Sequence, residues 1–398
     1  MKTPSKATST YDIVTDSAKK LSPNSNPEWA WCYCFLPALF IYIALLMHHL
    51  NAKPTVGHVE VLHPDFHSIF PSGSSLQVIA SGMGWTEGPV WVEDSNCECS
   101  YLLFSDTITN RIWRWEEGKG LFTVGKTLHT TNSGCSALNK DWCHTLKEPG
   151  SNGLSVYLGS KRGDLVVCQH GDRSVSIIYE NGTSVVLASH YRGKRLNSPN
   201  DLVWSLEGHL YFTDPPYGLI NHAGAINDQQ LTMSGVFMLD KDAIAESLRT
   251  GAPSNNLRLV DDSLSRPNGL AFSPDFQKLY VSNSDATYPL WKVFDVTENG
   301  DLQNGRIFSD ASHLRDSDMS VNNNPDGLKV DTNGNVIATG PGGVLVLSSS
   351  GVLLGRLILD SKVSNVGFGG DGYLYITSAD KVLRIRTTST PASAFRLK

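Results

Sequence analysis

Six carboxylate or carboxamide residues each open a short apolar segment, and this recurrence marks the part of the chain best suited to chemistry. They are Glu87, Asn152, Asn200, Asn268, Asp326 and Asn365. Their spacing fits a repeat of roughly fifty residues with insertions, so they occupy equivalent places in successive units. Six such side chains meeting at one ring suit a hard cation such as Ca²⁺, which takes roughly six to eight oxygen ligands. The alternative is that each Asn or Asp beside glycine only makes a turn.

The elements that must position these residues are short β-strands. A second strand, rich in aromatic and β-branched residues, follows several of the openings, as in GHLYFTD, QKLYVSN, GNVIATG and GYLYITS. Propeller blades are roughly 40–50 residues long. We therefore predict an all-β fold, a six-bladed β-propeller over residues 76–390, in which LQVIA (76–80) pairs with the last blade. A helix is expected over 240–249. A two-sheet sandwich competes, but it does not explain six matched polar openings.

The segment before the propeller predicts a membrane anchor. Residues 1–28 are polar and indicate a disordered tail, whereas residues 29–50 carry no formal charge and match the roughly 20 apolar residues of a transmembrane helix. A buried core helix and a cleaved signal peptide are the alternatives. Lys19 and Lys20 precede the segment, so the positive-inside rule predicts a single-pass signal-anchor with a cytoplasmic N-terminus. Residues 51–75 are then a linker to a luminal or extracellular propeller.

Composition excludes two classes of protein. The 398 residues include 33 Lys and Arg against 39 Asp and Glu, a net charge of −6, which argues against a nucleic-acid partner because binding needs a basic face. Hydrophobic residues make up 40%, too many for wholesale disorder. Among the seven cysteines, Cys135 and Cys143 can close a loop if the compartment is oxidising. Nothing in the sequence indicates a protein partner.

The chain resembles a known family in motifs that occur in the family's order. They are EGPVW (87–91), FSDTITNRIWRW (104–115), NSPNDLVW (197–204), YFTDPPYG (211–218), RPNGLAFSPD (266–275) and NPDGLKVD (324–331). Over about residues 80–385 it is similar to the SMP-30/gluconolactonase/LRE-like family. The resemblance implies a six-bladed propeller that holds one divalent cation in its channel and hydrolyses sugar or other lactones.

The resemblance also implies roles for particular residues. By position, the family's metal ligands fall on Glu87, Asn268 and Asp326, and Asp326 is also the acid/base. The substrate-contacting Asn-Asp pair falls on Asn200 and Asp201, a region that reaches the metal in some members. Where sugar-binding members have an arginine two residues before that Asn, this chain has Ser198, and the nearby Arg195 is not equivalent.

The chemistry of lactone hydrolysis assigns the remaining candidates. A channel cation polarises the carbonyl and lowers the pKa of water, and Asp326 takes the water proton and returns it to the ring oxygen. Asn152 and Asn200 supply N–H donors to the oxyanion or to hydroxyl groups. His170 is either a second acid/base or a structural histidine. Tyr217, in a loop expected to cover the channel mouth (215–233), either stacks on a sugar ring or packs that loop.

These inferences predict a metal-dependent lactone hydrolase that opens a sugar lactone such as glucono-1,5-lactone to the aldonate. The expected cofactor is one divalent cation, with Ca²⁺ favoured and Zn²⁺, Mn²⁺ or Mg²⁺ as alternatives. The expected partners are the lactone and, through the anchor, a membrane. Two other functions stay open: a membrane-anchored strictosidine-synthase-like or arylesterase propeller, and a non-catalytic binding propeller with a structural ion.

Overall fold

A computed structural model describes residues 55–94, 97–122, 132–158, 163–314 and 323–392. The predicted tail and anchor (1–28 and 29–50) lie outside these residues, so the anchor, the orientation and the luminal or extracellular location stay predictions. Within the described ranges, no helix has the length and apolar character needed to cross a membrane.

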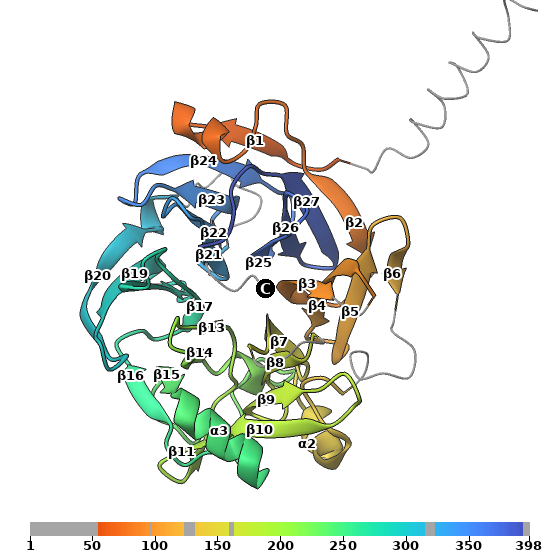
Figure 1. Cartoon of the computed structure of the whole chain (residues 1–398), viewed down its shortest axis with the longest axis vertical. Coiled ribbons are helices and arrows are strands. Elements are labelled where there is room, and N and C mark those ends of the chain that lie inside the picture. Colours follow the sequence, from red (N-terminus) through yellow and green to blue (C-terminus); the bar gives the residue numbers. More distant parts are fainter. Residues whose placement is uncertain (1–54, 95–96, 123–131, 159–162, 315–322, 393–398) are drawn as a thin grey trace, which may run out of the picture. The chain divides into compact units, whose positions relative to one another are not determined.

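Six sheets of four or five strands, counted over the described residues, form the propeller (Figure 1). The first four sheets each run from an inner strand outward in chain order, and so does the fifth up to its outermost strand, which is β1. The inner strands β3, β7, β13, β17, β21 and β25 contact one another in succession, and β25 contacts β3. The ring is therefore closed around a central channel, which confirms the predicted six-bladed propeller.

Each of the first three blades consists of consecutive strands of the chain. The first blade contains β3 (Thr86–Asp94), β4 (Cys99–Asp106), β5 (Arg111–Glu116) and β6 (Gly120–Phe122). The second contains β7 (Ser151–Val156), β8 (Leu165–Gln169), β9 (Ser174–Ile178) and β10 (Ser184–Ala188). The third contains β13 (Leu202–Trp204), β14 (Leu210–Asp214), β15 (Gly235–Leu239) and β16 (Arg258–Asp261).

The other three blades follow the same plan. The fourth contains β17 (Pro267–Phe272), β18 (Lys278–Asn283), β19 (Leu290–Val296) and β20 (Leu302–Asp310). The fifth contains β21 (Leu328–Val330), β22 (Val336–Gly340), β23 (Gly343–Leu347) and β24 (Leu353–Ile358). The sixth contains β25 (Val363–Phe368), β26 (Tyr373–Ser378) and β27 (Lys381–Arg386), and β2 (Gln77–Ser81) pairs with β27. The predicted closure by LQVIA is confirmed.

Outside the blades lie one small hairpin and several short helices. The hairpin joins β11 (His190–Tyr191) to β12 (Lys194–Arg195). The short helices are η2 (Pro64–Ser68), η3 (Ala137–Asn139), α2 (Lys140–Cys143), η4 (Tyr217–Leu219) and η5 (Ser312–Leu314). The predicted helix is α3 (Lys241–Thr250). The Asp240 carboxylate caps its start by accepting a hydrogen bond from the Ala243 N–H at 2.8 Å.

The core consists of apolar clusters between neighbouring blades, and the two-residue period of the strands creates them. On β14, Leu210 and Phe212 pack toward the second blade, whereas Tyr211 packs toward the fourth. Side chains alternate between the two faces of a strand, so a blade with neighbours on both sides needs apolar residues on both. This explains why the second strands have continuous apolar runs.

Close backbone contacts between blades account for the repeated glycines. A Cβ added at Gly153 would lie 2.7 Å from the Asn200 carbonyl oxygen of the next blade, and one at Gly269 would lie 2.5 Å from the Asp326 carbonyl oxygen. Residue 88 is also a glycine, with a φ of 51°. A glycine after an opening residue therefore lets neighbouring inner strands approach each other closely. The opening residues thus do more than form turns.

Residues 58–70, which the sequence assigns to a linker, pack onto the propeller. The strand β1 (His58–Val61) adds a fifth strand to the fifth blade by pairing with β24. Phe66, Ile69 and Phe70 are buried in the cluster between the fifth and sixth blades. The folded unit consequently begins before residue 76, because these apolar side chains cover an edge that the repeat leaves open.

Candidate active site at the mouth of the channel

The six opening residues lie at the starts of the six inner strands. Four of them are within strands, at Glu87 (β3), Asn152 (β7), Asn268 (β17) and Asn365 (β25). Asn200 and Asp326 come two residues before β13 and β21. Five are buried, and Asp326 is partly exposed. Because the inner strands form a closed ring, these polar residues share one end of the channel.

One hydrogen bond spans the channel directly. The amide nitrogen of Asn365, on the sixth blade, donates to Oδ2 of Asp201, on the third, at 3.2 Å. These blades face each other across the ring (Figure 1). Lys329 Nζ lies 3.9 Å from the same carboxylate oxygen. Asp201 therefore belongs to the ring beside its neighbour Asn200, and the channel is narrow at this level.

Burial and mutual repulsion disfavour ionisation of the ring carboxyls. Burial is the main cause that raises the pKa of Glu87 to about 8, and the charge of Asp201 adds to it. Burial also raises the pKa of Asp326 well above its ordinary value, followed by the charges of Glu87 and Asp201. Placing such carboxylates together is costly without a compensating cation. The ring therefore has the electrostatics of a cation site.

Two oxygen atoms of the ring support the same conclusion. Oδ1 of Asp326 and Oδ1 of Asn152 are buried and have no hydrogen-bond partner among the described residues. Buried acceptors are normally satisfied, so these two atoms are suited to an external cation or a substrate. Oxygen donors of this kind fit a hard divalent ion. The residues present thus fit the cation that the sequence predicts.

Carboxylates alone do not form a tight cluster at the ring. Among the described residues, one group of three His, Cys, Asp or Glu side chains has its ligand atoms within 4.8 Å of one another. This group is Asp94, Cys97 and Cys99. Cys97 and Cys99 form a disulfide, so their sulfurs are not thiolate ligands. A cation at the ring would need amide oxygens beside the carboxylates.

His170 lies behind Asn152 and is held through both ring nitrogens. Nδ1 is 3.2 Å from the Glu148 carbonyl oxygen, and Nε2 is 3.3 Å from the Asn152 amide nitrogen. A carbonyl only accepts hydrogen bonds, so Nδ1 carries the proton and Nε2 accepts from Asn152. Complete burial lowers the pKa of His170 to about 4. The imidazole is therefore neutral and orients the Asn152 amide.

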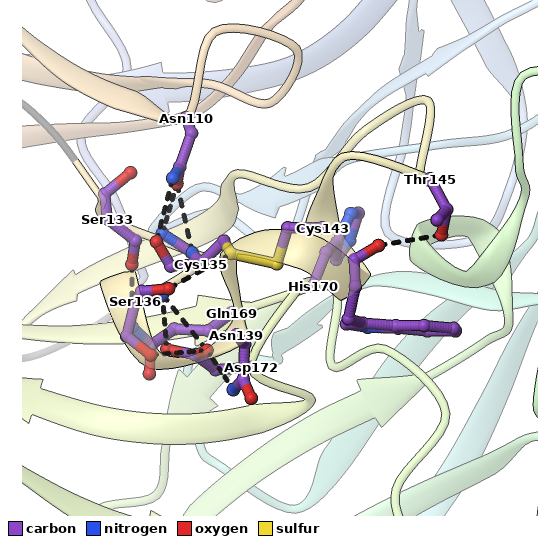
Figure 2. Close-up of a disulfide and its surroundings, with 12 residues drawn as sticks. Asn110, Ser133, Cys135, Ser136, Asn139, Cys143, Thr145, Gln169, His170 and Asp172 are labelled. Carbon is purple, nitrogen blue, oxygen red and sulfur yellow. Dashed lines mark hydrogen bonds between the residues drawn. A yellow bond between two sulfur atoms is a disulfide. The ribbon is translucent and has the colours of Figure 1, made fainter.

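Two loops enclose His170 and form one wall of the mouth. On one side is the loop closed by the Cys135–Cys143 disulfide, which lies beside His170 in Figure 2. On the other is the loop over 215–233, whose Gly218 packs against the imidazole. The two loops are joined where the Lys147 N–H donates to the Ile220 carbonyl at 2.9 Å.

Ser198 fastens the second of these loops. Its hydroxyl donates to the Pro215 carbonyl at 2.5 Å and accepts from the Gly218 N–H at 2.9 Å. Tyr217, in η4, donates its hydroxyl to the Ser284 carbonyl at 2.8 Å, and the charge of Asp326 contributes to its raised pKa. Asn324, two residues before Asp326, donates to the same Ser284 carbonyl at 3.1 Å, which places Tyr217 near the ring. Arg195 donates to the Asp172 carbonyl at 2.9 Å and does not replace the family arginine.

Glu148 is a carboxylate at the mouth that the sequence does not reveal. Its backbone carbonyl bonds His170, which in turn bonds Asn152, and its charge contributes to the raised pKa values of both Glu87 and Asp326. No other blade has an acidic residue at the matching position in its approach to the inner strand. The one feature of the sequence that could have indicated Glu148 is weak: an acidic residue four positions before the opening residue Asn152.

The described structure contains two hollows, and the smaller one reaches Lys329, which lies 3.9 Å from Asp201. A cavity of about 370 Å³ is lined by the later residues of the inner strands, including Trp204 and Phe272. A wider surface hollow of about 610 Å³ lies over the first and sixth blades, between Trp91 and Arg384. Neither is lined by a ring residue, so we assign the site to the ring and its two loops.

This arrangement defines a β-propeller with an oxygen-lined site at one mouth of its channel. A family model described as the SMP-30/Gluconolactonase/LRE-like region matches residues 85–380. A gluconolactonase of Zymomonas mobilis is 35% identical over 345 residues, which cover 84% of this chain and 87% of that protein. The chain belongs to the SMP-30/gluconolactonase/LRE-like family, as its motifs predict.

Solved structures agree with this assignment. A gluconolactonase of Xanthomonas campestris superposes with a TM-score of 0.67 at 28% identity, covering 85% of this chain and 98% of the other. A calcium-binding protein, regucalcin, of Agrobacterium tumefaciens has a TM-score of 0.53 at 13% identity, covering 85% and 96%. The second likeness shows the shared fold alone.

Proposed function

We propose that the protein is a metal-dependent lactone hydrolase acting on sugar-type lactones such as glucono-1,5-lactone. Its relatives support the broader class, a lactonase-type hydrolase. The observation that carries the metal-dependent proposal is the ring itself, where buried carboxyls adjoin the unpartnered oxygens of Asp326 and Asn152 among the described residues. A scaffold propeller has no need for such an arrangement.

The residues proposed to hold the cation are Glu87, Asn200, Asn268 and Asp326. All four lie within two residues of the start of an inner strand, at the same end of the channel. All offer oxygen, which favours Ca²⁺ while leaving Mg²⁺, Mn²⁺ and Zn²⁺ as alternatives. When bound, a divalent cation supplies a positive charge that polarises the lactone carbonyl and lowers the pKa of water.

Asp326 is the proposed acid/base. Water adds to the carbonyl carbon, and Asp326 accepts one water proton through its unpartnered oxygen. As the ring C–O bond breaks, Asp326 returns that proton to the ring oxygen, which becomes a hydroxyl group. The other proton leaves when the new acid ionises, so the product is the carboxylate.

The amides of Asn152 and Asn200, with Asp201, are the proposed substrate contacts. His170 accepts one amide hydrogen of Asn152, which leaves the second hydrogen and the unpartnered Oδ1 for the lactone. This geometry favours a positioning role for His170 over the acid/base role considered from the sequence. Tyr217 uses its hydroxyl on Ser284, so its ring face is the part proposed to stack on the substrate.

Lactone hydrolysis with and without a chelator tests the proposal. The full chain should open glucono-1,5-lactone, lose activity with EDTA and regain it when a divalent cation is restored, with elemental analysis following metal content. A protein that binds the cation yet opens no lactone would support a non-catalytic binding propeller. Hydrolysis of an aryl ester without lactonase activity would support the arylesterase alternative.

A further inference from the structure

Glu148 is presented to the channel mouth by a backbone that is fixed at each neighbouring residue. Its own carbonyl accepts from His170 Nδ1 at 3.2 Å. The next residue, Pro149, accepts from the Gly171 N–H at 3.1 Å, and the Gly150 N–H donates to the Thr107 carbonyl at 2.7 Å. With Lys147 tied to the other loop, these contacts come from three separate parts of the chain. The position of the Glu148 side chain is therefore set by tertiary structure.

The segment just before Glu148 is fastened as firmly. The Asn110 side chain accepts from the Gly134 N–H at 2.8 Å, and Asp172 accepts from the Ser136 N–H at 3.0 Å (Figure 2). The Cys135–Cys143 disulfide then closes the loop. It packs so closely on Gly171 that a Cβ there would lie 2.6 Å from Cys143 Sγ. A covalent bond and several hydrogen bonds thus hold the loop that leads to Glu148 against the turn that carries His170.

The Glu148 carboxylate takes part in no hydrogen bond or ion pair among the described residues. Burial raises its pKa, and the charge of the neighbouring Lys147 opposes that rise. Its backbone carbonyl and the Asn152 amide share His170 as a hydrogen-bond partner, so Glu148 lies directly behind a ring residue, and its charge contributes to the raised pKa values of Glu87 and Asp326. No three carboxylate oxygens of the described ring lie within 4.8 Å of one another, so Glu148 is outside a tight ligand cluster with them. Glu148 therefore belongs to the wall of the proposed substrate space, with His170 between it and Asn152.

We propose that Glu148 is a specificity-determining residue that accepts hydrogen bonds from hydroxyl groups of the lactone. The inference rests on the proposed lactonase function and deepens it: the site would select polyhydroxylated lactones over lactones without hydroxyl groups. A carboxylate is a strong acceptor for hydroxyl donors, and a site built to bond a substrate hydroxyl discriminates against the analogue that lacks it.

Two six-membered lactones test this proposal, namely glucono-1,5-lactone, which carries hydroxyl groups, and δ-valerolactone, which has none. Glu148→Ala should lower kcat/KM for gluconolactone by about 10- to 100-fold, as expected for hydrogen bonds to a charged group. The loss on δ-valerolactone should be below about threefold. Glu148→Gln keeps one acceptor oxygen, so its kcat/KM for gluconolactone should lie between those of the parent and of Glu148→Ala. It also provides a test if Glu148→Ala fails to fold. Glu207→Ala, at an exposed position, is the matched control.

The outcomes separate this inference from the proposed function. Selective loss on gluconolactone, with metal content unchanged by elemental analysis, supports hydroxyl recognition by Glu148. Equal losses on both lactones, or no loss on either, would overturn that role while leaving the lactonase proposal intact. If the metal-loaded parent opens neither lactone, the proposed function itself fails, and the inference fails with it.

Discussion

Breaking the Cys135–Cys143 disulfide should weaken both the fold and the catalytic site. The change that breaks it is the double variant Cys135→Ala with Cys143→Ala. The two cysteines are separated by 8 positions in the sequence, and the chain-entropy model gives about 2.5 kcal/mol for closing a loop of this size. The free energy of unfolding should fall by about that amount, because the unfolded chain gains the freedom that the bond removes.

Activity should fall as well, because the disulfide packs on Gly171 beside His170 and fastens the loop that leads to Glu148. A shift of the wall by about 1 Å can cost up to 100-fold in rate, so we expect kcat/KM for glucono-1,5-lactone to drop by about 10- to 100-fold. Urea denaturation and steady-state kinetics on the full chain measure the two effects separately.

The second disulfide provides the control. Cys97 and Cys99 are separated by 2 positions, and Cys99 is the first residue of β4, beyond the far end of β3, whereas Glu87 is near the start of β3. Cys97→Ala with Cys99→Ala should leave kcat/KM at the parent value. If the Cys135/Cys143 double variant loses stability but keeps parent kinetics, the loop does not position the site. If its stability is also unchanged, the loop-closure reasoning is wrong.

Two further predictions concern burial at the ring. In the parent, the unfolded chain binds a proton on His170 near its ordinary pKa of 6.5, whereas the folded protein does so only near 4. As the pH falls from about 6.5 to about 4, the free energy of unfolding of the parent should therefore decrease by up to about 3 kcal/mol relative to that of His170→Gln. If urea titrations of the two proteins show a difference in stability that does not depend on pH, the burial of His170 is contradicted. Gly269→Ala would place a methyl group 2.5 Å from the Asp326 carbonyl oxygen and should cost about 1–3 kcal/mol. An unchanged thermal midpoint would argue against that close approach.

The repeat made the fold predictable because each blade uses the same physical solution. Polar opening residues meet at the channel, and the apolar runs after them supply two faces for two neighbouring blades. The strand β1 escaped prediction because HVEV has no counterpart in the repeat. It is recruited by the exposed edge of β24, which only the assembled sheet defines.

The ring was accessible from sequence, but the wall around it was not. Glu87 and Asp326 could be placed because they stand at repeat-equivalent positions. Glu148 occupies a loop whose path depends on a disulfide and on backbone bonds from distant segments, so no local pattern reports it. Whether His170 is buried depends on how two loops fold over it, and the sequence therefore left its role open.

The most direct test of the proposed mechanism is lactone hydrolysis by Asp326→Asn across a range of divalent-cation concentrations. This change keeps an oxygen at the ring but removes the proton acceptor, so at saturating metal the rate should remain about 10²–10⁴-fold below the parent. Glu87→Gln is the matched variant, and its activity should recover in part as the metal concentration rises, since it alters a proposed ligand alone. A metal-loaded Asp326→Asn protein, verified by elemental analysis, that turns over at the parent rate would contradict the acid/base role of Asp326.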